Sequence, residues 1–237
     1  MKLPFAVFCL FLCGLSPASS ETIEVDGTSY FDAELVEVCK DGAVYRVEGE
    51  SSFVTLPWAG VSASQLAAVK AKFSGAMENA KFDACLVKGT VFQITPDGVV
   101  VQIDLVEDES GPEFQNGARV LRNGLVIIED LPGADRLEDG APVETVAHKR
   151  RTFTYDMGIA AKEIPFLTVA KPLWGMEQEW KNTSGQVMTA KLLAVKEGKG
   201  MFEKSGKRFI VELSSLDEDA QTRAREVEEK LAGFPLP

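Results

Sequence analysis

Histidine, cysteine and recognisable catalytic motifs are scarce in this chain, and each shortage excludes a class of protein. The 237 residues include one histidine, His148, and four cysteines, and no CxxC pair or Cys/His cluster occurs. The usual zinc-site spacings are therefore absent. The motifs G-x-S-x-G, H-E-x-x-H and G-x-G-x-x-G are also missing, which excludes the common serine hydrolases, zinc proteases and dinucleotide-binding enzymes. We expect no catalytic residues, no metal site and no cofactor.

Basic residues are in deficit as well. Lys and Arg number 25 against 36 Asp and Glu, which gives a formal net charge of −11. An acidic chain repels phosphate backbones, so we expect no nucleic-acid partner. One short stretch is nevertheless strongly basic, and it comprises His148, Lys149, Arg150 and Arg151. It is either a charged strand end that balances the acidic surface or a local site for an anionic ligand.

Long apolar runs are missing except at the N-terminus. Residues 3–15 form an apolar segment behind Lys2, and the small residues that follow place Ala18 and Ser20 at the −3 and −1 positions of a cleavage site. This segment is shorter than the about 20 residues that a spanning helix needs. We predict a signal peptide over residues 1–20, no membrane span in the mature chain, and a secreted or periplasmic location.

Only two cysteines remain after cleavage, Cys39 and Cys85. An export route permits disulfides, and a bond between these two would close a loop of roughly 46 residues, which is worth about 4 kcal/mol in the chain-entropy model. The alternative is a pair of free thiols.

Three segments repeat the pattern Ala-x-Leu followed by Val or Leu. They are YFDAELVEV (30–38), KFDACLVKG (81–89) and VMTAKLLAV (187–195). In the first and third segments the apolar positions change parity, from Leu35 to Val36 and from Leu192 to Leu193. Such a change indicates a β-bulge, because an extra residue reverses which face of the strand points inward.

The first and third copies continue in the same way. Each shows a turn with Gly, a second strand, a second turn and a third strand, and then a helical pattern. The predicted helices cover residues 62–77 and 216–233, the second with Gly233 as its C-cap candidate. Their apolar stripes are Leu66, Val69, Phe73 and Met77, and Ala220, Ala224, Val227 and Leu231. Foreign sequence separates the copies, so we interpret them as duplicated modules rather than a contiguous array.

The third copy has further features that are typical of a family. It ends in VELSSLDEDAQ (211–221), and it also contains Trp180, Gly185, Ala190, Gly198 and Gly206. With these features, residues 179–221 resemble the SLA-homology-one (SHD-type) module of exported bacterial proteins. Residues 30–66 resemble a diverged copy that lacks a counterpart of Trp180. The resemblance implies an SH3-like barrel for both.

The middle of the chain departs from this pattern after its first strand. Residues 89–108 show a hairpin pattern around Pro96-Asp97-Gly98. Further strand candidates are residues 124–133, 141–150, 152–158 and 166–172. Several short strands without a helix favour a closed or nearly closed barrel, and we expect an OB-like one.

We therefore predict a mainly β protein made of multiple small β-barrels, with a helix closing each SH3-like module. SH3-like module one with its helix covers residues 21–78, the central OB-like barrel covers 79–173, and SH3-like module two with its C-terminal helix covers 174–237.

Trp58, Trp174 and Trp180 are the candidate partner-binding residues. SH3-like barrels recognise extended peptides in grooves lined by aromatic side chains. The alternative is packing in the core or between domains. Two acidic stretches, residues 106–110 and 129–140, could instead supply paired carboxylates for hydrolysis or oxygen ligands for calcium.

These observations favour a non-enzymatic exported binding or scaffolding protein that recognises a protein or peptide partner in the cell envelope. The alternative is a carboxylate-based hydrolase that acts on an envelope polymer. Two carboxylates about 5–10 Å apart across a deep cleft would favour the enzyme.

Overall fold

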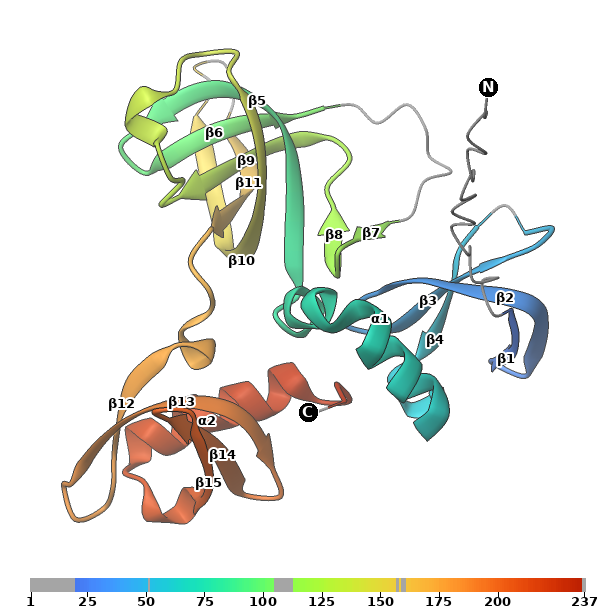
Figure 1. The fold of residues 1–237 in the computed structure, drawn as a ribbon. Coiled ribbons are helices and arrows are strands. Elements are labelled where there is room, and N and C mark those ends of the chain that lie inside the picture. The colour runs from blue at the N-terminus through green and yellow to red at the C-terminus, as the bar shows by residue number, and fades with distance from the viewer. Residues whose placement is uncertain (1–19, 51, 105–112, 157, 159–160, 236–237) are drawn as a thin grey trace, which may run out of the picture.

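The protein is mainly β, and its described residues form three sheets and two α-helices (Figure 1). The computed structural model describes residues 20–235, except 51, 105–112, 157 and 159–160. The predicted signal peptide lies outside the described residues. No helix in the described part of the chain has both the length and the apolar composition that crossing a membrane requires.

The first and third sheets are antiparallel meanders of four strands with the same order. The first contains β1 (Glu21–Val25), β2 (Thr28–Val38), β3 (Gly42–Val47) and β4 (Val54–Pro57). The third contains β12 (Glu177–Lys181), β13 (Val187–Lys196), β14 (Lys199–Lys204) and β15 (Lys207–Glu212). A 3-10 turn and an α-helix follow each sheet: η1 (Trp58–Gly60) and α1 (Ala63–Lys81), and η4 (Leu213–Ser215) and α2 (Glu218–Leu231).

The strand registers of the first and third sheets match each other. Leu35 pairs with Tyr45 across β2 and β3, as Leu192 pairs with Phe202 across β13 and β14. The pairing in each sheet shifts directly after this leucine, so both predicted bulges are present. Equivalent residues therefore keep a constant separation along the chain.

The expectation of three strands in each copy was wrong, because each sheet begins with one more strand. Glu21 pairs with Ala33 in the first sheet, as Gln178 pairs with Ala190 in the third. Each of these extra strands is five residues long and contains two acidic side chains, so neither shows a strong apolar pattern. Ile23 occupies the place of Trp180, two residues after the equivalent pair, and is buried.

Both helices form where the sequence predicts them. Ser62 caps α1 in a capping box with Gln65, and α1 extends to Lys81. Asp217 caps α2 by accepting a hydrogen bond from the Ala220 amide. The predicted stripe of α2 is fully buried.

The second sheet forms from the middle of the chain. Its strands are β5 (Ala84–Thr95), β6 (Gly98–Ile103), β7 (Phe114–Gln115), β8 (Ala118–Val120), β9 (Gly124–Glu129), β10 (Pro142–Asp156) and β11 (Ala161–Thr168). The predicted hairpin at residues 95–98 joins β5 to β6. Pairing runs from β10 through β11, β9, β6 and β5, and then returns to β10.

Two strand candidates in the middle, residues 141–150 and 152–158, are one continuous strand rather than two. The register of β10 against β11 shifts between Lys149 and Arg151. This irregularity lets the first half of β10 pair with β5 and the second half with β11. The basic residues interrupt the apolar alternation but not the strand, because they lie at the bulge.

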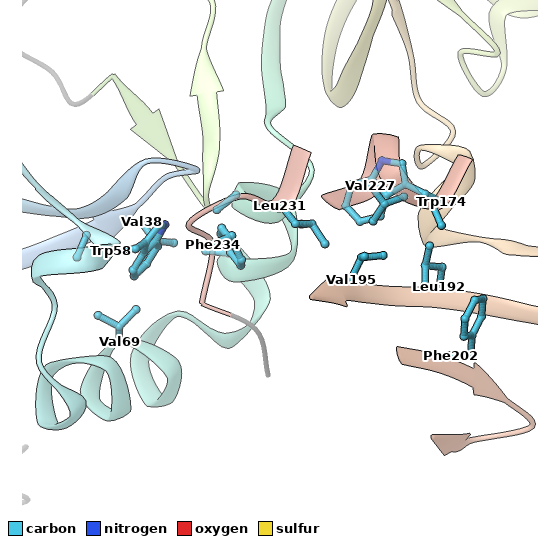
Figure 2. Close-up of a cluster of buried hydrophobic side chains, with 14 of the residues drawn as sticks. Val38, Trp58, Val69, Trp174, Leu192, Val195, Phe202, Val227, Leu231 and Phe234 are labelled. Carbon is cyan, nitrogen blue, oxygen red and sulfur yellow. The ribbon is translucent and has the colours of Figure 1, made fainter. Parts of the chain in front are cut away.

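We call the first sheet with α1 the first unit, the second sheet the second unit, and the third sheet, with α2 and the turn that precedes the sheet, the third unit. The first and third units share one apolar cluster (Figure 2). Phe234 follows α2 and reaches the first unit, where its ring lies 5.6 Å from that of Trp58 in an edge-on arrangement. Trp58 also donates a hydrogen bond from Nε1 to the Lys40 carbonyl, at 2.7 Å. The end of the chain therefore connects the two copies.

Hydrogen bonds to the buried Glu37 carboxylate connect the second sheet to the first. Glu37 accepts hydrogen bonds from the backbone amides of Asn116, at 2.7 Å, and Gly117, at 3.2 Å. These two residues form the turn between β7 and β8. Gly117 has a φ of +76° and lies so close to α1 that a Cβ atom there would be 1.9 Å from the Ala76 carbonyl oxygen.

Candidate functional site

A cavity of about 590 Å³ lies where the three units meet. The first unit contributes Lys40, from the turn after β2, and residues at the end of α1. The second sheet contributes residues of β10 and the end of β11, and the third unit contributes η3 (Leu173–Gly175), β12 and α2. The joint between α1 and β5 adds Phe82 and Asp83.

The lining of this cavity is basic, although the chain as a whole is acidic. Its seven Lys and Arg side chains are Lys40, Lys81, Lys149, Arg150, Lys171, Arg223 and Lys230. Its acidic side chains are Asp83, Asp130 and Glu226. Four positive charges are therefore in excess here, against a net charge of −11 for the whole chain. A wall of one sign concentrates counter-ions of the opposite sign.

Several of these cations already have partners. Arg150 pairs with Glu129, and Lys171 pairs with Glu78. Arg223 lies 4.9 Å from the ring centre of Trp180 and donates to Gln178 and to the Glu179 carbonyl. Across the described residues, Lys149 and Lys230 form no salt bridge, and both are exposed.

Lys81 is the most constrained cation of the cavity. Its Nζ donates to the Leu193 carbonyl at 2.8 Å and lies 5.6 Å from the ring centre of Trp174. Burial lowers the pKa of Lys81, and the nearby Arg208 lowers it further, while Glu78 opposes the change. Lys81 therefore connects the first unit to the third as well as lining the cavity.

Phe82, Trp174 and His148 form a group of packed rings in the wall, which also includes Trp180. Phe82 packs against Trp174 at 4.6 Å and against the His148 imidazole at 5.7 Å, measured between ring centres. Gly175 makes this approach possible, because a Cβ atom there would lie 2.3 Å from Phe82 Cζ. Any other residue at position 175 would displace the Phe82 ring.

Two polar atoms in this wall have no hydrogen-bond partner among the described residues, namely His148 Nδ1 and Trp174 Nε1. The side chains are only 7% and 8% exposed. Burial lowers the pKa of His148, the Phe82 backbone raises it, and the positive charge of Lys171 lowers it. Buried polar atoms nearly always have partners, so an unpaired one requires an explanation.

The structure brings five of the predicted site residues together at this cavity. They are His148, Lys149, Arg150, Trp174 and Trp180. Arg151 lies elsewhere, on the other side of the β10 bulge, with its guanidinium 4.4 Å from the ring centre of Phe166. Trp58 packs against Phe234 instead.

All three Trp residues are buried, at 8% exposure for Trp58, 8% for Trp174 and 1% for Trp180. Trp180 Nε1 donates to the Ala190 carbonyl at 3.0 Å inside the third unit. An aromatic groove for an extended peptide needs partly exposed rings, so these residues act in packing and in lining the cavity.

Sequence reasoning missed five of the lining cations, namely Lys40, Lys81, Lys171, Arg223 and Lys230. Each is a single cation in an otherwise unremarkable local sequence, and only the packing of the three units makes them neighbours. No pattern along the chain would have selected them.

Among the described residues, the other candidates do not form a site. Cys39 and Cys85 are free thiols, and burial raises the pKa of both. Residues 106–110 lie outside the described residues. Within the other acidic stretch, Asp135 pairs with Arg136. Among the residues that the structure describes, no three His, Cys, Asp or Glu side chains gather as metal ligands would.

No family model, no curated protein and no solved structure matches the chain. The case for function therefore rests on the cavity.

Proposed function

We propose that the protein is a non-enzymatic, exported binding protein whose site is the cavity between the three units, and that it binds an anionic ligand there. The excess of positive charge on the cavity wall, in an acidic chain, is the observation that carries this proposal. The volume of about 590 Å³ lies within the range of pockets for small ligands.

The modules are the scaffold for this site. We propose that the first and third units are SH3-like modules of the SLA-homology-one type and that the second is an OB-like barrel. Support comes from the shared meander with its bulge and from the pairing in the second sheet that returns to β10. In this proposal the units do not each bind a peptide, because their Trp residues are buried; they enclose one common site.

The test uses charge reversal at two exposed cations of the cavity. The mature chain, from Glu21, is titrated calorimetrically with an acidic hexapeptide, inorganic phosphate and benzoate, and with a basic hexapeptide as a negative control. We expect at least one anion to bind and the basic peptide not to bind. Lys149→Glu combined with Lys230→Glu should abolish this binding.

The matched control reverses two exposed lysines outside the cavity, with Lys162→Glu and Lys204→Glu. It changes the net charge equally and should leave binding within about twofold, because exposed charges at a distance are screened by salt. Equal loss in both double variants would show a general charge effect and reject the cavity as the site.

Export has its own test. N-terminal sequencing of the protein isolated from its native cells should begin at or within a few residues of Glu21. A soluble cytoplasmic protein that still carries Met1 would contradict the proposed export.

A further inference from the structure

We infer that the ligand of the cavity is a compact oxyanion attached to a planar apolar group, and that Trp174 Nε1 donates a hydrogen bond to the oxyanion. This inference rests on the proposed function and specifies the class of ligand.

Two buried nitrogen atoms beside the cavity have no hydrogen-bond partner among the described residues. His148 and Trp174 come from different units, both residues line the cavity, and their Nδ1 and Nε1 atoms are buried. An indole N–H can only donate, so its missing partner must be an acceptor. Bonds from such donors to charged oxygens are shorter and stronger than those to neutral ones. The acceptor that the wall supports best is therefore negatively charged.

Two lysines on different elements give the cavity a positive field. Lys149 and Lys230 approach the cavity from β10 and α2, and neither is paired across the described residues. A carboxylate or a phosphate that reaches Trp174 would therefore lie in a positive field from two units. An ammonium is a compact point charge that suits either oxyanion.

Aromatic rings form another part of the cavity wall. The Phe82 ring packs against both Trp174 and His148, and Phe82 itself is half-buried. Both nitrogen atoms are buried, and Phe82 packs against the two rings that carry them, so in this inference the ligand displaces the Phe82 ring to reach them. A planar apolar group can replace the contacts that Phe82 loses, which a bare inorganic anion cannot do. Ring–ring contacts of this kind favour an aromatic ligand.

The key variant is Trp174→Phe, which keeps one aromatic ring and removes the indole N–H together with the five-membered part of the indole. Trp174 Nε1 has no partner in the part of the chain that the structure describes, so its loss should not break a hydrogen bond of the fold. The proposed bond to the ligand should be lost, which we expect to weaken binding by about 10-fold or more.

The probes are benzoate and phenyl phosphate, which distinguish a carboxylate from a phosphate. Acetate and inorganic phosphate provide the same anions without a ring, and benzyl alcohol provides the ring without charge. Binding is measured by calorimetry and by the indole ¹H–¹⁵N signal that Trp174→Phe removes. We expect benzoate or phenyl phosphate to bind at least 10-fold more tightly than the ring-free anion and to shift this signal, and benzyl alcohol not to bind.

Three outcomes would overturn the inference, and they are distinct. Equal affinity for ring-free anions would reject the planar group. Anion binding that Trp174→Phe leaves unchanged, without a shift of the indole signal, would reject the hydrogen bond while leaving the proposed function intact. If no anion binds, the proposed function fails as well. Val187→Ala, at an exposed position outside the cavity, is the control for general effects of substitution.

Discussion

Ala33 and Ala190 show how a single small residue constrains each copy. They occupy equivalent positions opposite the first strand of their sheets, Ala33 opposite Glu21 and Ala190 opposite Gln178. Both are completely buried. A larger side chain has no free space at either place.

We predict that Ala33→Leu and Ala190→Leu each destabilise the protein by about 1–3 kcal/mol, because overpacking forces neighbouring side chains and backbone to move. Urea unfolding of each variant measures this cost. A Leu at the exposed position of Phe31 should change stability by less than about 0.5 kcal/mol. If one alanine accepts Leu without cost, the two copies do not share a packed core position.

His148 is the residue that makes stability depend on pH near neutrality. Its strand neighbours Ala84 and Thr168 are not titratable. Burial lowers the pKa of His148, and the positive charge of Lys171 lowers it further. The folded protein therefore binds the proton less tightly than the unfolded chain, whose His pKa is about 6.5. The stability that this difference in the His148 pKa contributes is present above about pH 6.5 and is lost as the pH falls below it.

We predict that the wild-type protein loses stability between about pH 7 and pH 5 more steeply than the His148→Gln variant. Urea midpoints across this range, for both proteins, provide the measurement. Identical slopes would show that His148 titrates normally in the folded state. A bound oxyanion should reduce the wild-type slope, because it stabilises the protonated imidazole.

At the scale of elements, the two copies differ in how they use equivalent strand positions. Glu37 on β2 corresponds to Ala194 on β13, since each follows the bulge and pairs with β3 or β14. Ala194 is buried, whereas the Glu37 carboxylate holds the turn between β7 and β8. One substitution between the copies thus turns a core position into a link between sheets.

We predict that Glu37→Ala, which installs the residue of the other copy, costs about 1–3 kcal/mol because the Val38, Asn116 and Gly117 amides lose their side-chain acceptor. Hydrogen exchange should show faster exchange of the Asn116 and Gly117 amides. Glu34→Ala removes an exposed carboxylate that pairs with Arg46, and it should cost less than about 1 kcal/mol. Unchanged protection of Asn116 would disprove the link.

At the scale of the whole molecule, the C-terminal segment joins the first and last units. Phe234 is 8% exposed, although it lies near the end of the chain. Its partner, Trp58, is in the first unit, so removal of one ring should weaken an interface between copies rather than a single core.

We predict that Phe234→Ala costs about 3 kcal/mol, which is typical for truncating a buried Phe. It should also expose Trp58, which a red shift of tryptophan fluorescence would report. Phe31→Ala removes a ring that is 66% exposed and should leave both stability and fluorescence unchanged. A variant at Phe234 that behaves like this control would mean that the two units do not depend on the C-terminal contact.

The predictions of structure that succeeded depend on patterns within a few neighbouring residues. The bulges after Leu35 and Leu192, the hairpin at 95–98 and the two helices were predictable because alternation, turn residues and caps act over a few neighbouring positions. The short polar strands β1 and β12 were missed because their stability comes from pairing with longer neighbours.

What the sequence by itself determined was the mainly β class, the duplication and the local basic stretch at His148–Arg150. These follow from short-range periodicity and from composition, which the chain carries without reference to its folded shape. Only the tertiary structure decided that Lys40, Trp174 and Lys230 border one cavity. Side chains so distant along the chain become neighbours through the packing of the units, and the positive field of the cavity exists only where their charges converge.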